Sequence, residues 1–220
     1  MGRLSLPEEL TLLHRNRAGG SHGLPGPAVA AGVLAELDRL GKIQLADPEI
    51  HVVDPQPTAV PMFDGVLEQL ANRGEPTGIL SFLCGQEQLH ENCLDQLTQL
   101  GCLRAEERLV LWLFPVQRYW PHQSTLEEII TPVWNLLRGS TEPDGRAQQL
   151  AALLYGSGAG DALFREHADR KVLRQLTQDD LLGLALLKLR TSRTGARGGP
   201  VHGGMHGGAA GAAGAAGGGA

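Results

Sequence analysis

Apolar residues recur at helical spacing along most of this chain, and a glycine or proline follows nearly every run. Val33, Leu34, Leu37 and Leu40 form one such stripe, and Gly41 follows at the position of a helix C-cap. The pattern predicts a mainly α-helical fold. Helices are expected over residues 28–40, 62–70, 79–83, 89–100, 126–137, 146–155, 161–176 and 179–189, and from residue 6 to the glycines at 19 and 20.

Two segments lack this spacing and are predicted to form short β-hairpins. Residues 42–53 alternate or carry β-branched side chains around Asp47-Pro48. Residues 108–121 combine β-prone and aromatic side chains on either side of Pro115. At the other end of the chain, Thr177 is expected to be the N-cap of the last helix. The body is therefore expected to be a single globular multi-helix domain with one or two short β-hairpins.

The end of the chain is too poor in apolar bulk to fold. Residues 198–220 contain eleven glycines and seven alanines, so little burial is available to offset the loss of chain entropy. We predict a globular domain over residues 1–192 and a disordered Gly/Ala-rich tail over residues 193–220.

The charge balance and the apolar runs exclude several classes of protein. Nineteen Lys and Arg against 24 Asp and Glu give a net charge of −5, which disfavours nucleic acid as a partner, including for a winged-helix DNA binder. The longest apolar stretch, Leu109–Val116, is far shorter than the roughly 20 residues that cross a bilayer. The N-terminal residues lack the pattern of a signal peptide. We therefore expect a cytoplasmic protein, with peripheral attachment to the inner face of a membrane as one option.

No motif in the chain predicts catalysis. Gly156-Ser157-Gly158 follows a helical run, which favours a turn between helices over a nucleophile elbow. Cys84, Cys93 and Cys102 form no CxxC pair and are expected to be reduced thiols in the core. The histidines are scattered singly and predict no metal site. We expect no enzymatic activity and no cofactor; convergent histidines and carboxylates in a deep pocket would reverse that expectation.

The most basic cluster is His14-Arg15-Asn16-Arg17 at the end of the first helix. Cations are favoured near a helix C-terminus by the dipole alone, by about 0.3–1 kcal/mol. The alternative is an anion site in which guanidinium groups bind phosphate oxygens in bidentate geometry. The sequence leaves both interpretations open.

Several segments, in order and in register, resemble the Golgi phosphoprotein 3 family. They are Leu6-Pro7-Glu8-Glu9-Leu10, Val33 through Leu45, Thr58 with Asp64 through Leu67, Leu97 through Leu103, Leu113 through Tyr119, and Arg146 through Tyr155. The hairpin segment is similar to that of the bacterial branch. Sixteen arginines against three lysines are also typical of a GC-rich bacterial genome.

The resemblance implies a mostly helical domain with an exposed β-hairpin. The family's eukaryotic members are peripheral membrane proteins that bind phosphatidylinositol 4-phosphate and the cytoplasmic tails of glycosyltransferases. Their headgroup pocket uses a tryptophan and an arginine around the second helix, and two arginines on the helix before the hairpin. Here no tryptophan precedes Trp112, and the two later arginine positions fall on Glu87 and His90.

Two functional hypotheses follow. In the first, the chain is a non-enzymatic peripheral-membrane or adaptor domain, in which Arg15, Arg17 and His90 contact a phosphoinositide or another anionic lipid headgroup, and protein tails are possible partners. In the second, it is a protein-interaction module without a lipid role that forms homo-oligomers. Its self-association hairpin would carry four aromatic residues, Trp112, Phe114, Tyr119 and Trp120.

Overall fold

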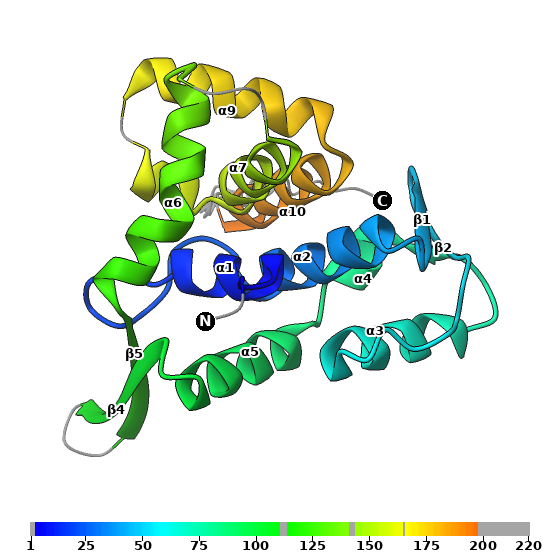
Figure 1. Ribbon diagram of the computed structural model, residues 1–220, viewed down its shortest axis with the longest axis horizontal. Helices are drawn as coiled ribbons and strands as arrows, with labels where there is room; N and C mark the ends of the chain where they lie inside the picture. Colours follow the sequence, from blue (N-terminus) through cyan, green and yellow to red (C-terminus); the bar gives the residue numbers. More distant parts are fainter. Residues whose placement is uncertain (1–2, 111–113, 141–143, 165, 198–220) are drawn as a thin grey trace, which may run out of the picture.

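The computed structural model describes residues 3–110, 114–140, 144–164 and 166–197, which form ten helices and two small antiparallel sheets (Figure 1). The helices are α1 (Leu6–Leu13), α2 (Pro25–Arg39), α3 (Pro61–Ala71), α4 (Ile79–Leu83), α5 (Glu87–Gln99), α6 (Gln123–Leu137), α7 (Gly145–Ser157), α8 (Gly160–Leu163), α9 (His167–Asp179) and α10 (Leu181–Arg197). The predicted mainly α-helical fold is confirmed.

Helix α2 lies at the centre of the molecule and contacts α1, α3, α4, α5, α7 and α10. Every residue from Gly26 to Leu37 is buried. Small residues allow its neighbours to approach closely: a Cβ on Gly32 would lie 2.9 Å from the Pro7 nitrogen of α1. The stripe that predicted this helix therefore faces the core, as far as Leu37.

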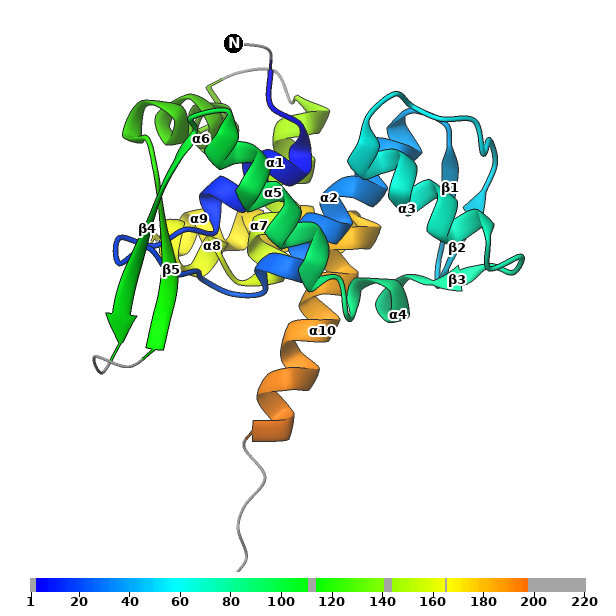
Figure 2. The same cartoon turned by 90° about the horizontal axis from the view of Figure 1, so that it is seen from below.

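Both predicted hairpins are present. Strands β1 (Ile43–Ala46) and β2 (Glu49–Val52) pair antiparallel, and a short third strand, β3 (Thr77–Gly78), joins the free edge of β2. Strands β4 (Leu103–Val110) and β5 (Phe114–Pro121) form the second hairpin, which begins five residues earlier than the sequence predicted, at Leu103 rather than at residue 108. Figure 2 shows this second hairpin projecting from the helical body.

The first helix is shorter than predicted. It ends at Leu13, with His14 as its C-cap, instead of continuing to the glycines. The chain then turns back on itself, and Arg15 pairs with Ser21 in an isolated antiparallel bridge. The basic cluster therefore lies in a loop beyond the helix.

The prediction of one helix over residues 161–176 is wrong. The chain forms α8 and then α9, because Phe164 takes an extended conformation between them. Phe164 is completely buried, and its ring meets Trp134 edge-on with centroids 4.9 Å apart. The break lets this aromatic side chain enter the core.

The predicted N-cap of the last helix is also wrong. Thr177 is buried inside α9, where its hydroxyl donates to the Leu173 and Ala152 carbonyls at 2.8 and 3.2 Å. The Asp180 carboxylate takes the capping role and accepts from the Gly183 amide at 2.6 Å. Helix α10 continues to Arg197, so residues 193–197, which were predicted to belong to the disordered tail, are helical, and the end of the helix projects from the body (Figure 2). Residues 198–220 lie outside the described part of the chain.

The cysteines match the prediction only in part. Cys93 and Cys102 are buried as expected, but Cys84 is exposed at the end of α4, so its assignment to the core is wrong.

Within the described residues, no cluster of histidine, cysteine or acidic side chains could hold a metal ion. The described helices also include none with the length and apolarity that crossing a bilayer requires.

Candidate functional site

The loop between α1 and α2 is bound to the base of the second hairpin. The Tyr119 amide donates to the Gly19 carbonyl at 3.1 Å, and the Trp120 indole N–H donates to the Arg17 carbonyl at 3.4 Å. Gly19 has a φ of +75°, and a Cβ there would lie 2.9 Å from the Trp120 ring. The close approach of loop and strand therefore requires glycine at this position.

The Asn16 side chain gives this loop its shape. Its Oδ1 atom accepts from the amides of Ala18 and Gly20, both at 2.9 Å. The backbone N–H of Asn16 in turn donates to the Gly20 carbonyl at 3.0 Å. An asparagine that satisfies local backbone donors is a common way to stabilise a tight turn. The turn therefore sets the path of the loop from Arg15 to the residues that bind the hairpin.

Arg15, His90 and Tyr119 meet at this junction, from the loop, α5 and β5 respectively. The Arg15 Nη2 atom donates to His90 Nε2 at 2.8 Å, and the Arg15 guanidinium carbon lies 6.0 Å from the centre of the Tyr119 ring. The Nε atom of Arg15 and the Nδ1 atom of His90 are buried, and neither has a hydrogen-bond partner in the described part of the chain. The junction thus holds polar groups with unused bonding capacity.

Burial sets the charges at the junction. It lowers the pKa of His90 to about 3, with a further contribution from the Arg15 charge, and it lowers the pKa of Arg15 to about 10. At neutral pH, His90 is therefore neutral and Arg15 is a cation. Arg15 makes no ion pair with a carboxylate of the described residues. The junction therefore carries a half-buried positive charge without a counterion in the described part of the chain.

The predicted site residues are only partly brought together. Arg15 and His90, which are far apart in the sequence, are in direct contact. Arg17 is exposed and approaches the hairpin through its backbone carbonyl. Tyr119 was assigned to the self-association hairpin, but its ring lies beside Arg15. Trp112 lies outside the described residues.

One face of the hairpin is basic, a feature that the sequence analysis did not anticipate. Cross-strand partners share a face in an antiparallel pair, so Arg104 and Trp120 lie together with Arg108 and Arg118. The guanidinium carbons of Arg104 and Arg108 lie 5.6 and 5.0 Å from the Trp120 ring centre. We call these four residues the basic face. Glu106 pairs with Arg104 at 2.9 Å and with Arg108 at 3.6 Å, which leaves the face net positive.

Two large apolar side chains are exposed where the hairpin strands end farthest from the body. Phe114 is 61% and Leu109 is 62% exposed. Both lie farther along the same two strands, Phe114 on the side of the basic face and Leu109 on the opposite side. Exposed apolar groups next to basic ones are a common arrangement in surfaces that contact membranes or other proteins.

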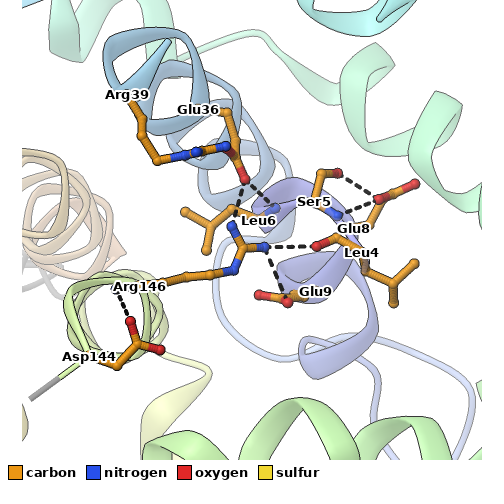
Figure 3. A network of polar contacts seen from close by, with 9 residues as sticks. All are labelled: Leu4, Ser5, Leu6, Glu8, Glu9, Glu36, Arg39, Asp144 and Arg146. Carbon is orange, nitrogen blue, oxygen red and sulfur yellow. Dashed lines mark hydrogen bonds and ion pairs between the residues drawn. The ribbon is translucent and has the colours of Figure 1, made fainter. Parts of the chain in front are cut away.

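A charged network of four side chains, Glu9, Glu36, Arg39 and Arg146, lies elsewhere and was missed by the sequence analysis (Figure 3). Arg146 of α7 donates to the Glu36 carboxylate at 2.8 Å and to the Leu4 carbonyl at 2.8 Å, and it pairs with Glu9 at 3.2 Å. The Leu6 amide donates to Glu36 at 3.0 Å. The sequence signal that could have revealed this network was Glu36, a glutamate inside the apolar run of α2. The network connects α1, α2 and α7 and uses its charges internally.

These partners determine the ionisation of the two carboxylates. Burial alone raises the pKa of Glu36, but hydrogen bonds from Arg146, Arg39 and the Leu6 amide bring it below its usual value. Burial raises the pKa of Glu9, and Arg146 offsets only part of that effect. Most of these groups bond to one another, and the network stabilises the fold, although the buried Nε atom of Arg146 has no partner among the described residues.

A histidine and a serine also meet in the core. His14 Nδ1 is 2.7 Å from the Leu10 carbonyl, and its Nε2 is 2.9 Å from the Ser157 hydroxyl. Both residues are completely buried, so no substrate can reach the hydroxyl. Ser157 closes α7 directly before Gly158, which has a left-handed φ of 91°, and the predicted turn between helices is confirmed. This pair holds α1 against α7.

Comparison with known families agrees with the described fold. The family model for Golgi phosphoprotein 3 (GPP34) matches residues 6–191, which include nearly all of the helical body and the hairpin. The chain belongs to this family. No curated protein matches the chain with significance. The Golgi phosphoprotein 3 family is not a family of enzymes.

Proposed function

We propose that this Golgi phosphoprotein 3 domain is a peripheral membrane protein that binds phosphorylated lipid headgroups at the junction of Arg15, His90 and Tyr119. The observation that carries the proposal is a half-buried arginine without a carboxylate partner among the described residues, next to buried nitrogens without partners. A phosphate group would supply both the missing charge and the missing acceptors. Hydrogen bonds to charged groups contribute about 1.5–3 kcal/mol each.

The hairpin extends this site toward a membrane surface. Arg118 and Trp120 of the basic face lie on the same strand as Tyr119, which points to the opposite side of the hairpin, and the backbone of the exposed Arg17 is held beside Trp120. Arginines near an anionic surface contribute affinity that decreases with salt. Phe114 and Leu109 then offer apolar area to the interface between headgroups and acyl chains. Headgroup selection is thus assigned to the junction on one side of the hairpin, and general membrane attraction to the basic face on its other side.

Co-sedimentation with vesicles tests the proposal. Phosphatidylcholine vesicles with and without phosphatidylinositol 4-phosphate are mixed with the full chain at low salt. We expect selective binding that Arg15→Gln weakens about tenfold or more, because one charged hydrogen-bonding group is lost. An additional Arg17→Gln substitution weakens it further. Arg73→Gln is the matched control, since Arg73 is exposed at the end of α3, away from the hairpin (Figure 2). Equal binding by Arg15→Gln and Arg73→Gln would refute the assignment.

Self-association through the hairpin is the second candidate function. The exposure of Phe114 and Leu109 favours it, because such groups also occur at protein interfaces. Analytical ultracentrifugation of the chain and of Phe114→Ser decides the matter. A dimer or larger species that Phe114→Ser dissociates supports self-association, whereas a monomer over the whole concentration range eliminates it.

A further inference from the structure

The contact between Arg15 and His90 fixes the charge state of the histidine. A guanidinium can only donate hydrogen bonds, so His90 Nε2 must accept and must carry no proton. The single ring proton is then on Nδ1, which is buried without a partner among the described residues. The pair therefore carries one positive charge, and a second proton on His90 would break the 2.8 Å hydrogen bond.

The groups around His90 do not stabilise its cation. Arg15 faces it from the loop, Tyr119 lies across Arg15 on β5, and His14 is the completely buried neighbour of Arg15. The nearest acidic residues on its own helix are Glu87 and Glu91, and both are exposed. Asp95, farther along α5, is also exposed. In the described structure, no carboxylate pairs with Arg15 or His90, so both positive charges would lack a counterion.

We propose that binding of a phosphate monoester headgroup at this junction is linked to the uptake of one proton by His90. This inference rests on the proposed function. A phosphate dianion bound beside Arg15 supplies the counterion that the described residues do not provide, and a protonated His90 can then donate to its oxygens. A ligand that binds the protonated form more tightly raises the proton affinity of that group, and by reciprocity the headgroup binds more tightly as the pH falls. Linkage of one proton gives at most about a tenfold change in affinity per pH unit.

Two substitutions distinguish binding linked to proton uptake from binding at a site with a fixed positive charge. His90→Arg supplies a permanent charge at the same position, so we expect binding that no longer takes up a proton. His90→Gln keeps a hydrogen-bonding group without a titrating one, and should bind more weakly at low pH and without proton uptake. His122→Gln is the matched control, because His122 is exposed at the start of α6, just beyond the hairpin. Far-ultraviolet circular dichroism checks that each variant is folded.

Calorimetry provides the test. The full chain is titrated with a soluble short-chain phosphatidylinositol 4-phosphate, between about pH 5 and pH 8, in buffers with different enthalpies of ionisation. The dependence of the binding heat on the buffer gives the number of protons taken up. We expect more proton uptake, by a fraction of a proton up to one, in the wild-type chain and in His122→Gln than in His90→Arg. The His90→Arg reference removes the proton exchange that belongs to the phosphate itself.

The outcomes distinguish the two proposals. Binding with the same proton count in the wild-type chain and in His90→Arg overturns the linkage and leaves the proposed function intact. Absence of binding in the wild-type chain and in every folded variant overturns the proposed function, and the linkage with it. Binding that takes up additional protons only when His90 is present supports both.

Discussion

Replacing Arg146 with methionine tests how much of the stability depends on the network in Figure 3. The substitution keeps an apolar stem of similar length but removes the cation that pairs with Glu9 and one of the two that pair with Glu36, and these carboxylates are 7% and 4% exposed. Removing one partner of a buried ion pair typically costs about 3–5 kcal/mol. Because the Arg146 side chain is 19% exposed and water can reach part of the network, we expect the free energy of unfolding to fall by about 2–4 kcal/mol. Urea unfolding followed by circular dichroism measures it.

Arg39→Met is the matched control for that experiment. Arg39 also pairs with Glu36, at 2.7 Å, but its side chain is 66% exposed. Exposed ion pairs contribute about 0–1 kcal/mol, so the free energy of unfolding of this variant should fall by no more than about 1 kcal/mol. Equal losses from Arg39→Met and Arg146→Met would refute the argument that burial makes the Arg146 contacts strong.

The same network predicts a dependence on pH. Because the pKa of Glu36 is depressed in the folded chain, its contribution is complete above the ordinary value and is lost as the pH falls below it. The pKa of Glu9 is raised, so Glu9 acts in the opposite sense and destabilises the fold once it ionises. Without Arg146, both carboxylates bind protons more readily. The stability difference between Arg146→Met and the wild-type chain should therefore narrow as the pH falls from about 7 to about 4.

Three further predictions concern the hairpin junction and the core. Gly19→Ala should lower the free energy of unfolding by about 1–3 kcal/mol and weaken vesicle binding. Gly74 has a similar positive φ but open space around it, so Gly74→Ala should lower the free energy of unfolding by less. Equal melting temperatures of the two variants would contradict this expectation. Phe114→Ser should change the unfolding free energy by less than about 0.5 kcal/mol yet reduce vesicle binding, and a large stability loss would place Phe114 in the core. Ser157→Ala should cost about 1–3 kcal/mol in urea unfolding, because His14 Nε2 loses its donor; an unchanged midpoint would exclude that role.

Much of the architecture could be predicted because it depends on local patterns. The helix at the apolar stripe of α2 and the turn at Asp47-Pro48 were both predicted correctly, because each depends on residues close together in the chain. The first helix was predicted too long because the sequence does not show that residues 14–22 leave α1 to dock on the hairpin. The break at Phe164 was missed because its cause is a distant partner, Trp134.

The candidate site could be predicted only in part, for the same physical reason. Arg15 was identified as a basic residue after the first helix and His90 from the family resemblance, but their contact joins positions 75 residues apart. Tyr119 was identified as an aromatic hairpin residue, and only the strand register shows that it faces Arg15 while Trp120 faces the arginines. Arg146 was read only as part of a helix, because its partners, Glu9 and Glu36, lie more than a hundred residues away.

The most direct test of the central claim is an NMR titration of the histidine ring resonances with a soluble phosphatidylinositol 4-phosphate. Headgroup binding beside Arg15 predicts saturable shifts of the His90 ring signals, while those of His51, on strand β2 away from the hairpin, remain unchanged. Saturable binding that leaves the His90 signals where they were would place the headgroup elsewhere and contradict the account.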